Sequence, residues 1–242
     1  MPARSSSPGR LASLALIGGD ELRRILGGEW NLLDHVDQHA LRTAATRTRL
    51  LDAARRLFTA RGFAGVTAED VVHDAGLTRG GLYHHFGGKG VLGGKEGTFA
   101  ALYEEVQRKV AAQILAAANE PRDAWTALRA GCHAFLDAYL HPTVRCVVVL
   151  DAPAVLGWEH WREVDARHGL GLLKEGLREA MAAGAIRDQP VDPVAHLLLG
   201  AMNEATMWIA RSAAPEAALR QAGESLDDLL AGLHHPSTTR GL

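Results

Sequence analysis

Hydrogen-bonding side chains and glycines are concentrated in one short stretch of the chain. Arg79 carries a planar guanidinium that can donate two parallel hydrogen bonds to a guanine in the major groove of DNA. Tyr83 and His84 carry donors of the kind that position a protein on phosphates. Gly80 and Gly81 have no side chain, so that DNA can approach the protein backbone closely. These residue types at this spacing therefore predict contact with double-stranded DNA.

A second candidate for chemistry is a pair of Gly-Gly-Lys sequences, at residues 87–89 and 93–95. Glycine-rich loops that end in lysine bind nucleotides when they follow the pattern G-x-x-x-x-G-K-[ST]. Here Lys89 stands in place of the first glycine and Glu96 in place of the serine or threonine. The sequence therefore does not predict a nucleotide site, and it leaves Lys89 and Lys95 as candidate cations for DNA phosphates.

No pattern in the sequence supports catalysis or metal binding. It contains no serine nucleophile elbow, no H-E-x-x-H pair and no paired-carboxylate motif. The two cysteines and the scattered histidines have no partners at zinc-ligand spacing. We therefore expect no enzyme activity, no metal and no cofactor. The low cysteine content favours a reducing cytoplasm as the setting.

Three helices are predicted to position the DNA-contacting stretch. Apolar residues at helical spacing predict the first helix over residues 45–61, which Gly62 ends. Thr67 opens the second helix with a capping-box pattern, and Gly76 ends it after two turns. Thr78 caps the third helix. Two short helices joined by a glycine turn are the helix-turn-helix pattern, in which the second helix enters the major groove.

Charge is divided unevenly along the chain. Residues 42–97, which we call the head, hold nine Lys and Arg against five Asp and Glu, a balance of +4. The rest of the chain holds 17 basic and 23 acidic residues, a balance of −6 behind a total of −2. Because attraction to phosphates depends on local positive charge, this segregation supports DNA binding by the head.

Length and composition describe an ordinary globular chain of one or two domains. Of its 242 residues, 47% are apolar and 22% are charged, and abundant Ala and Leu favour helix over sheet. No run of about 18 apolar residues is present, so we expect no membrane partner. A short apolar run at residues 11–17 weakly resembles a signal-peptide core but lacks an A-x-A cleavage site. We expect an all-α fold with a flexible extension over residues 1–41, the head over 42–97, a helical body over 98–234 and a flexible tail over 235–242.

Residues 46–86 read TRTRLLDAARRLFTARGFAGVTAEDVVHDAGLTRGGLYHHF and resemble the DNA-binding head of the tetracycline-repressor (TetR) family. The matching features are the ARRLF helix, the GF-x-x-VT-x-x-D-V turn and second helix, the AGLTRGGLYHHF segment and a following lysine. The resemblance implies an all-helical, dimeric, ligand-responsive transcription regulator. It places DNA contacts on Thr67, Thr78, Arg79, Gly80, Gly81, Tyr83, His84 and a lysine at the start of the fourth helix, Lys89 or Lys95.

This sequence departs from the family pattern at the joint that follows the third helix. The family passes from YHHF to the lysine through two or three residues, whereas here one of the two Gly-Gly-Lys sequences is an apparent insertion. Glycine adds backbone freedom, so we expect a looser joint between head and body.

Apolar periodicity predicts helices throughout the body, where an effector would bind. The apolar run at residues 144–150 suits a buried strand or a buried helix, and the lack of a partner strand favours the helix. Asp151 beside this run is either a local cap or a carboxylate that lines a ligand pocket. The candidate contacts for a largely apolar, unidentified small-molecule effector are large or polar residues on inward faces: Trp125, Phe135, Tyr139, Val148, Asp151, Trp158, Trp161, His168, Asn203 and Met207.

Two C-terminal helices carry heptad-like apolar seams, over residues 192–211 and 216–233. Such helices can pair with their own copy across a two-fold axis as a four-helix interface, in the manner that the resemblance implies, or both seams can serve the core of one subunit. The candidate interface residues are Val194, Leu198, Ala201, Ala205, Trp208, Leu219, Ala222, Leu226, Leu229 and Leu233.

Together these patterns predict a transcriptional regulator, a repressor by resemblance, that binds a near-palindromic operator as a homodimer. An effector in the body would favour the spacing of the two heads that does not fit DNA. The alternative is a helical small-molecule carrier or enzyme whose head resembles a DNA reader without binding a specific sequence.

Overall fold

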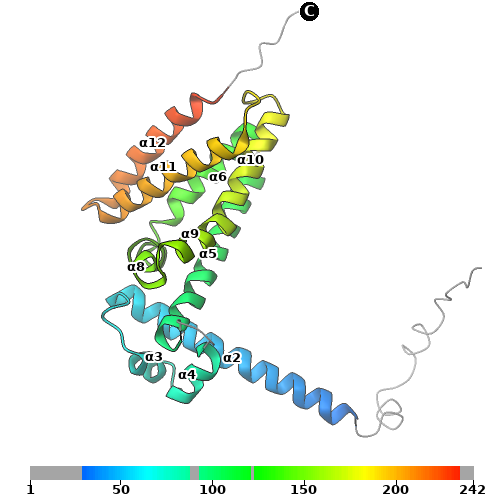
Figure 1. The fold of residues 1–242 in the computed structure, drawn as a ribbon, viewed down its shortest axis with the longest axis vertical. Helices are drawn as coiled ribbons and strands as arrows, with labels where there is room; N and C mark the ends of the chain where they lie inside the picture. Colours follow the sequence, from blue (N-terminus) through cyan, green and yellow to red (C-terminus); the bar gives the residue numbers. More distant parts are fainter. Residues whose placement is uncertain (1–28, 88–92, 121–122, 235–242) are drawn as a thin grey trace, which may run out of the picture. The chain divides into compact units, whose positions relative to one another are not determined.

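The computed structural model describes residues 29–87, 93–120 and 123–234 (Figure 1). Within these ranges the chain is helical apart from its loops and an isolated bridge between Ile186 and His234, which confirms the predicted all-α fold. Lys89 and the tail at 235–242 lie outside the described residues. The elements are α2 (Glu29–Arg61), α3 (Ala68–Asp74), α4 (Arg79–Phe86), α5 (Lys95–Asn119), α6 (Ala124–Ala138), α7 (Pro142–Val144), the π-helix η2 (Arg145–Asp151), α8 (Ala152–Leu156), α9 (Trp158–Asp165), the π-helix η3 (Ala166–Leu170), α10 (Gly171–Ala182), α11 (Val191–Arg211) and α12 (Pro215–Ala231).

The chain divides into two units, residues 1–48 and residues 49–242. In the first unit, the structure gives residues 29–41 as part of α2, where the sequence predicts a flexible extension. The segment Glu29–Arg61 contains neither glycine nor proline, so nothing in it interrupts a helix. Apolar periodicity did not indicate this part of the helix, and its apolar residue Leu41 is 68% exposed.

Within the second unit, the end of α2 packs with α3 and α4 around a small apolar core. Leu50, Ala54 and Phe58 of α2 are fully buried, as are Val71 of α3 and Leu82 of α4. Burying a large apolar side chain contributes about 1.5–3 kcal/mol. This core therefore fixes the orientation of α4 relative to α2.

Glycines in the left-handed region end the first two helices of the head, as predicted. Gly62 follows α2 with φ 68°, and Gly76 follows α3 with φ 61°. Arg49 reaches from α2 to this second turn and donates hydrogen bonds to the carbonyls of Ala75 (2.6 Å) and Gly76 (3.3 Å). The positive φ favours glycine here, and a Cβ at Gly76 would also lie 3.0 Å from the Arg49 guanidinium.

Both predicted N-terminal caps are present. The hydroxyl oxygen of Thr67 accepts from the Asp70 N–H (3.1 Å), and the Asp70 carboxylate accepts from the Thr67 N–H (2.8 Å), which completes the capping box. The hydroxyl oxygen of Thr78 accepts from the Gly81 N–H at 3.3 Å. These caps set the first turns of α3 and α4.

The described ends of the glycine-rich joint are held by hydrogen bonds. Gly94 donates to the carbonyl of Phe86 (3.1 Å), and the buried Thr98 hydroxyl donates to the carbonyl of Gly94 (2.7 Å). A Cβ at Gly94, whose φ is 63°, would lie 3.0 Å from the Tyr83 ring. The looseness predicted for this joint stays a prediction, since its residues 88–92 lie outside the described ranges.

The body is a bundle of α5, α6, α10, α11 and α12, with the short helices α8 and α9 beneath it in Figure 1. The apolar run that suits a strand or a helix is helical, in the π-helix η2, and its residues Val147 and Val148 are buried. The helices α9 and α10 follow one another through the π-helix η3, and Gly184 follows α10 with φ 70°.

No single helix in the described ranges has the length and apolarity needed to cross a bilayer. One bent pair, Ala124–Ala138 with Pro142–Leu156, meets the criterion of length and composition only when its two parts are joined across a 77° bend.

Candidate functional site

Helix α4 presents on its outer face the residues that the sequence assigns to DNA. Its inner face is formed by Leu82 and Phe86, which are buried in the head core. The outer residues Thr78, Arg79, Gly80, Tyr83 and His84 are exposed and Gly81 is half-buried. A helix with one anchored apolar face and one exposed polar face can enter a major groove without disturbing the core behind it.

Arg79 is held in place on this surface by two neighbours. Its guanidinium forms an ion pair with Glu69 of α3 at 2.7 Å and lies 5.7 Å from the centre of the Tyr83 ring. The side chain remains 64% exposed. Because water and salt weaken exposed ion pairs, Arg79 can exchange Glu69 for a guanine at small cost. Tyr83 acts here as a platform under Arg79, in addition to any phosphate contact.

The hydroxyl of Thr67 is already used inside the head. It donates to the Asp70 carboxylate at 2.8 Å, and the hydrogen bonds from Thr67 lower the pKa of Asp70 below its usual value. A DNA phosphate offers only acceptors, so a contact from Thr67 would require its hydroxyl proton to turn away from Asp70. Thr67 is exposed, and the structure is compatible with that contact only at this cost.

The geometry of Lys95 does not support the predicted DNA contact. Its ammonium donates to the carbonyls of Val66 (2.9 Å) and Phe63 (3.2 Å) and lies 3.8 Å from the centre of the Phe63 ring. Lys95 therefore fixes the loop between α2 and α3 from the start of α5. The sequence missed this role because it depends on contacts with residues about thirty positions away. Lys89 remains the candidate phosphate contact, and it lies outside the described residues.

A set of polar contacts joins the head to the body. Arg55 of α2 donates to Glu105 of α5 at 2.7 Å, and Lys109 also pairs with Glu105 at 2.7 Å. The hydroxyl of Thr59 donates to that of Thr143 at 3.0 Å. The head and the body are therefore linked by side-chain contacts from α2 as well as by the polypeptide backbone.

Asp151 also belongs to this junction, and it is neither the local cap nor the pocket-lining carboxylate that the sequence suggests. It accepts a hydrogen bond from the backbone N–H of Phe63 at 2.8 Å, so it caps the loop that follows α2 rather than its own helix. Beside it, the Cys146 thiol donates to the carbonyl of Phe58 at 3.2 Å, and burial raises the pKa of Cys146. The partner of Asp151 is distant in sequence, so local pattern could not identify it.

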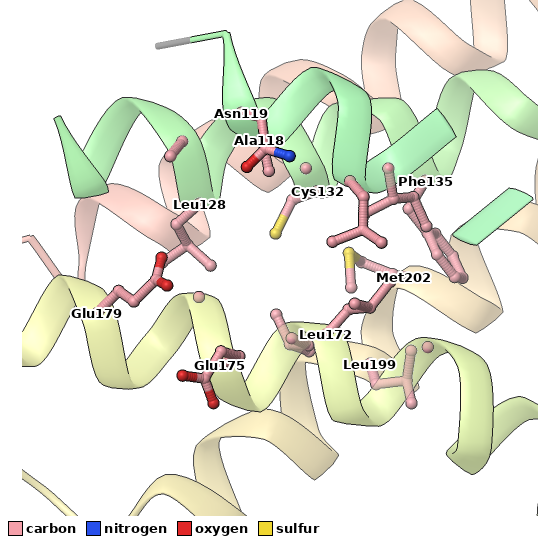
Figure 2. Close-up of a pocket in the computed structure, with 17 residues that line it drawn as sticks. Ala118, Asn119, Leu128, Cys132, Phe135, Leu172, Glu175, Glu179, Leu199 and Met202 are labelled. Atoms are coloured by element: carbon pink, nitrogen blue, oxygen red, sulfur yellow. The ribbon is translucent and has the colours of Figure 1, made fainter. Parts of the chain in front are cut away.

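A cavity of the body lies between α5, α6, α10 and α11 and has a volume of about 160 Å³ (Figure 2). In Figure 2 the side chains of Cys132, Phe135 and Met202 surround one space, and Glu175 and Glu179 lie on α10 at its side. Burial raises the pKa of the Cys132 thiol to about 12, so the thiol is a neutral lining group. The lining is mainly apolar, as expected of a site for a small lipophilic molecule.

The structure brings few of the ten predicted effector contacts to this cavity. Phe135 lines it, and His168 lines a small branch beside it. The remaining eight lie outside both hollows: Tyr139, Val148 and Trp161 are buried in the core, Trp125 packs on His234, Asp151 binds Phe63, Asn203 binds Asp165, Met207 is half-buried and Trp158 is 60% exposed. Bulky inward residues mostly fill the space into which they point. Predicting effector contacts from such residues therefore does not identify the residues that line the cavity.

The residues that create the cavity are small. Gly131 of α6, Gly169 of η3 and Gly176 of α10 all line it, with Ala118 and Ala127. A Cβ at Gly176 would already lie 3.3 Å from Leu128 across the gap. Glycines inside the helical patterns of the body were the signal that could have indicated this site.

An apolar surface remains on the two C-terminal helices, which lie side by side (Figure 1). Of the predicted interface residues, Leu198, Ala222 and Leu226 are buried in the subunit core, Ala201, Trp208 and Leu229 are exposed, and Val194, Ala205, Leu219 and Leu233 are half-buried. Leu197, which was not predicted, is 76% exposed on the same face of α11 as Ala201 and Trp208. Each of the two seams thus gives some residues to the subunit core and leaves others exposed, and the exposed members are available for a partner.

Comparisons with known proteins agree with this architecture. The model of bacterial regulatory proteins of the tetR family matches residues 50–92, and that of the tetracyclin repressor-like C-terminal domain matches residues 125–233. A TetR-family transcriptional regulator from Pectobacterium atrosepticum, known as a crystal structure, is 32% identical with a TM-score of 0.70 over 80% of this chain and 96% of that one.

Shorter matches occur with two curated proteins. The HTH-type transcriptional regulator SrpR of Pseudomonas putida is 44% identical over 54 residues, 21% of this chain and 25% of that protein. The HTH-type transcriptional repressor KstR2 of Rhodococcus jostii is 49% identical over 43 residues, 18% of this chain and 21% of that protein. Since the head and the C-terminal domain are both matched, and a solved relative is aligned over nearly its whole length, the chain belongs to the TetR family of DNA-binding transcriptional regulators.

Proposed function

We propose that this protein is a cytoplasmic, non-enzymatic repressor that binds a near-palindromic operator as a homodimer and releases it when a small molecule binds in the body. The observation that carries the proposal is the outer face of α4, where Arg79, Tyr83 and His84 are exposed on a basic head while Leu82 anchors the helix from behind. A two-fold dimer would place two such helices about 34–36 Å apart, or a multiple of that distance, along one face of DNA.

The exposed apolar face of α11 and α12 supports the dimer. Leu197, Trp208 and Leu229 are 76%, 48% and 57% exposed, and an apolar hollow of about 240 Å³ lies between the two helices. Large exposed apolar side chains that gather on one face mark a surface for a partner. A second copy of the chain offers the same face, which is what a two-fold interface requires.

Helix α5 supports coupling between the effector and DNA. Lys95 at its start holds the α2–α3 loop, Glu105 near its middle binds Arg55, and Ala118 near its end lines the cavity. At 1.5 Å per residue, about 35 Å separate the two ends. A ligand that displaces the cavity end of α5 therefore acts on the head through a continuous helix. It shifts the equilibrium between the two positions of α5 by the difference between its affinities for them.

The proposal is tested by gel shift of the DNA upstream of the protein's own gene, titrated at several salt concentrations. A repressor of this kind should prefer one segment over unrelated DNA of equal length and lose affinity steeply as salt rises, because phosphate contacts release counterions. Flat salt dependence without a preferred segment would favour the alternative, a helical small-molecule carrier.

A further inference from the structure

Asp165 at the end of α9 is an ionisable side chain buried inside the body. It is 6% exposed, and the other buried polar residues of the described ranges are neutral. The amide of Asn203 donates to its Oδ2 at 3.1 Å. Burial raises the pKa of Asp165, while Asn203 and the charge of Arg162 oppose that shift. In the described part of the chain, no lysine, arginine or histidine lies within ion-pair distance of this carboxylate.

The second oxygen of Asp165 lies close to a residue that lines the proposed effector cavity. Its Oδ1 lies 3.7 Å from the place where a Cβ of Gly169 would stand, and Gly169 lines the cavity. Asp165 itself lines a small branch, of about 10 Å³, that shares Ile114, Phe135 and Gly169 with the cavity. The carboxylate thus lines a small hollow that adjoins the cavity through these shared residues.

The charges around the cavity have one sign. Its charged lining residues are Glu175 and Glu179 of α10 (Figure 2). Among the residues that the structure describes, no lysine or arginine lines the cavity or its branch. His168 in the branch is bound to Glu104 at 3.2 Å. A buried carboxylate without a cation costs free energy that a positively charged ligand group would recover. The same charges repel an anionic ligand.

We infer that the effector is an apolar molecule with one primary ammonium group, which enters the branch and binds Asp165 while its apolar part fills the cavity between α6 and α10. This inference rests on the proposed effector site. The branch has room for about one water-sized group, which a primary ammonium matches and a trimethylammonium exceeds. Glu175 and Glu179 at the side of the cavity attract the cation before it reaches Asp165.

The test is calorimetric titration of the full chain with matched probes: phenylbutylamine, phenylbutanol, phenylbutyrate and phenylbutyl-trimethylammonium. The amine should bind about tenfold more tightly than the alcohol, because a charge-assisted hydrogen bond is stronger than a neutral one. Phenylbutyrate should bind most weakly, and the trimethylammonium probe should show no advantage over the alcohol.

Two variants locate the preference. Asp165→Asn keeps the size and polarity of the side chain and should bring the affinity for the amine to within about threefold of that for the alcohol. Gly169→Ala adds a methyl at ordinary contact distances, 3.7 Å from both Asp165 and Leu199, so the variant should fold. Its methyl stands beside Oδ1 in the branch and should also reduce the preference for the amine.

Glu179→Gln is the matched control, since it removes a carboxylate that lines the same cavity but is exposed. This variant should change the affinity for the amine relative to the alcohol by less than about threefold. That change should vanish at high salt, whereas the preference due to Asp165 persists. Equal binding of amine and alcohol, or a preference that survives Asp165→Asn, overturns the inference. If none of the four probes binds, the cavity is not an effector site, while the gel shift still decides separately whether the head binds DNA.

Discussion

At the scale of single residues, Arg79 carries the claim that the protein distinguishes one DNA sequence from another. The outer face of α4 offers one guanidinium, and only a planar fork can read a guanine with two parallel hydrogen bonds. Arg79→Ala should therefore reduce discrimination at one base position of the operator by about tenfold to a hundredfold. Gel shifts with operators changed one base pair at a time would measure this.

Arg79→Lys is the matched control for Arg79→Ala. It keeps the charge but not the fork, so it should keep most of the affinity for unrelated DNA and lose the preference at that position. Uniform weakening on every DNA would instead reassign Arg79 to a phosphate.

The raised pKa of Asp165 makes a prediction about stability. Because burial raises this pKa in the folded state above the ordinary value of 3.8, the folded protein holds the proton more tightly than the unfolded chain does. The contribution of Asp165 to stability therefore falls as the pH rises from 3.8 through the folded-state pKa.

Asp165→Asn removes this dependence on pH. The free energy of unfolding of the variant minus that of the wild type should therefore increase from pH 3.8 through the folded-state pKa of Asp165 and stay constant above it. Urea denaturation at a series of pH values would show this. A difference that stays constant with pH would mean that Asp165 is not a buried carboxylate.

At the scale of elements, the capping box fixes the start of α3. Thr67→Ala removes the acceptor for the Asp70 N–H and should lower the free energy of unfolding by about 1 kcal/mol. Thr67→Ser keeps the hydroxyl and should lose much less. Chemical denaturation of the three proteins would compare them, and equal losses in Ala and Ser variants would show that the methyl group, not the cap, stabilises the helix.

The junction between head and body depends on one acceptor. Asp151→Leu leaves the Phe63 N–H without its 2.8 Å partner and should lower the free energy of unfolding by about 1 kcal/mol. Hydrogen exchange at the Phe63 amide should become faster. Asp151→Asn retains an oxygen acceptor and should preserve slow exchange. If exchange at Phe63 were unchanged in the Leu variant, this bond would not hold the loop.

The sequence predicted the elements whose signals are local and missed the site that depends on distant packing. Thr67, Gly62 and Gly76 act within a few residues of their own position, so their roles could be predicted and are confirmed. The cavity could not be predicted in this way, since it is space left by Gly131 and Gly176 on facing helices. Such space depends on which helices meet, and bulky residues give no information about it.

At the scale of the whole molecule, the outer face of α11 should hold the dimer together. Leu197→Asp places a charge on a side chain that is 76% exposed in the subunit, so it should abolish the dimer while changing the free energy of unfolding by less than about 0.5 kcal/mol. Sedimentation of the variant would give its mass. Leu41→Asp makes the same change at a residue 68% exposed in the other unit and should leave the dimer intact. A Leu197→Asp protein that sediments as a dimer would place the interface elsewhere.

The central claim is that two copies of α4 read one duplex together. Footprinting of the purified protein on the DNA upstream of its own gene tests this most directly. The account predicts a protected, near-palindromic segment whose two half-sites are centred about 10 base pairs apart, or a multiple of that spacing, and it predicts that Arg79→Ala weakens the protection. A protected segment with a single half-site, or protection that does not depend on Arg79, would contradict it.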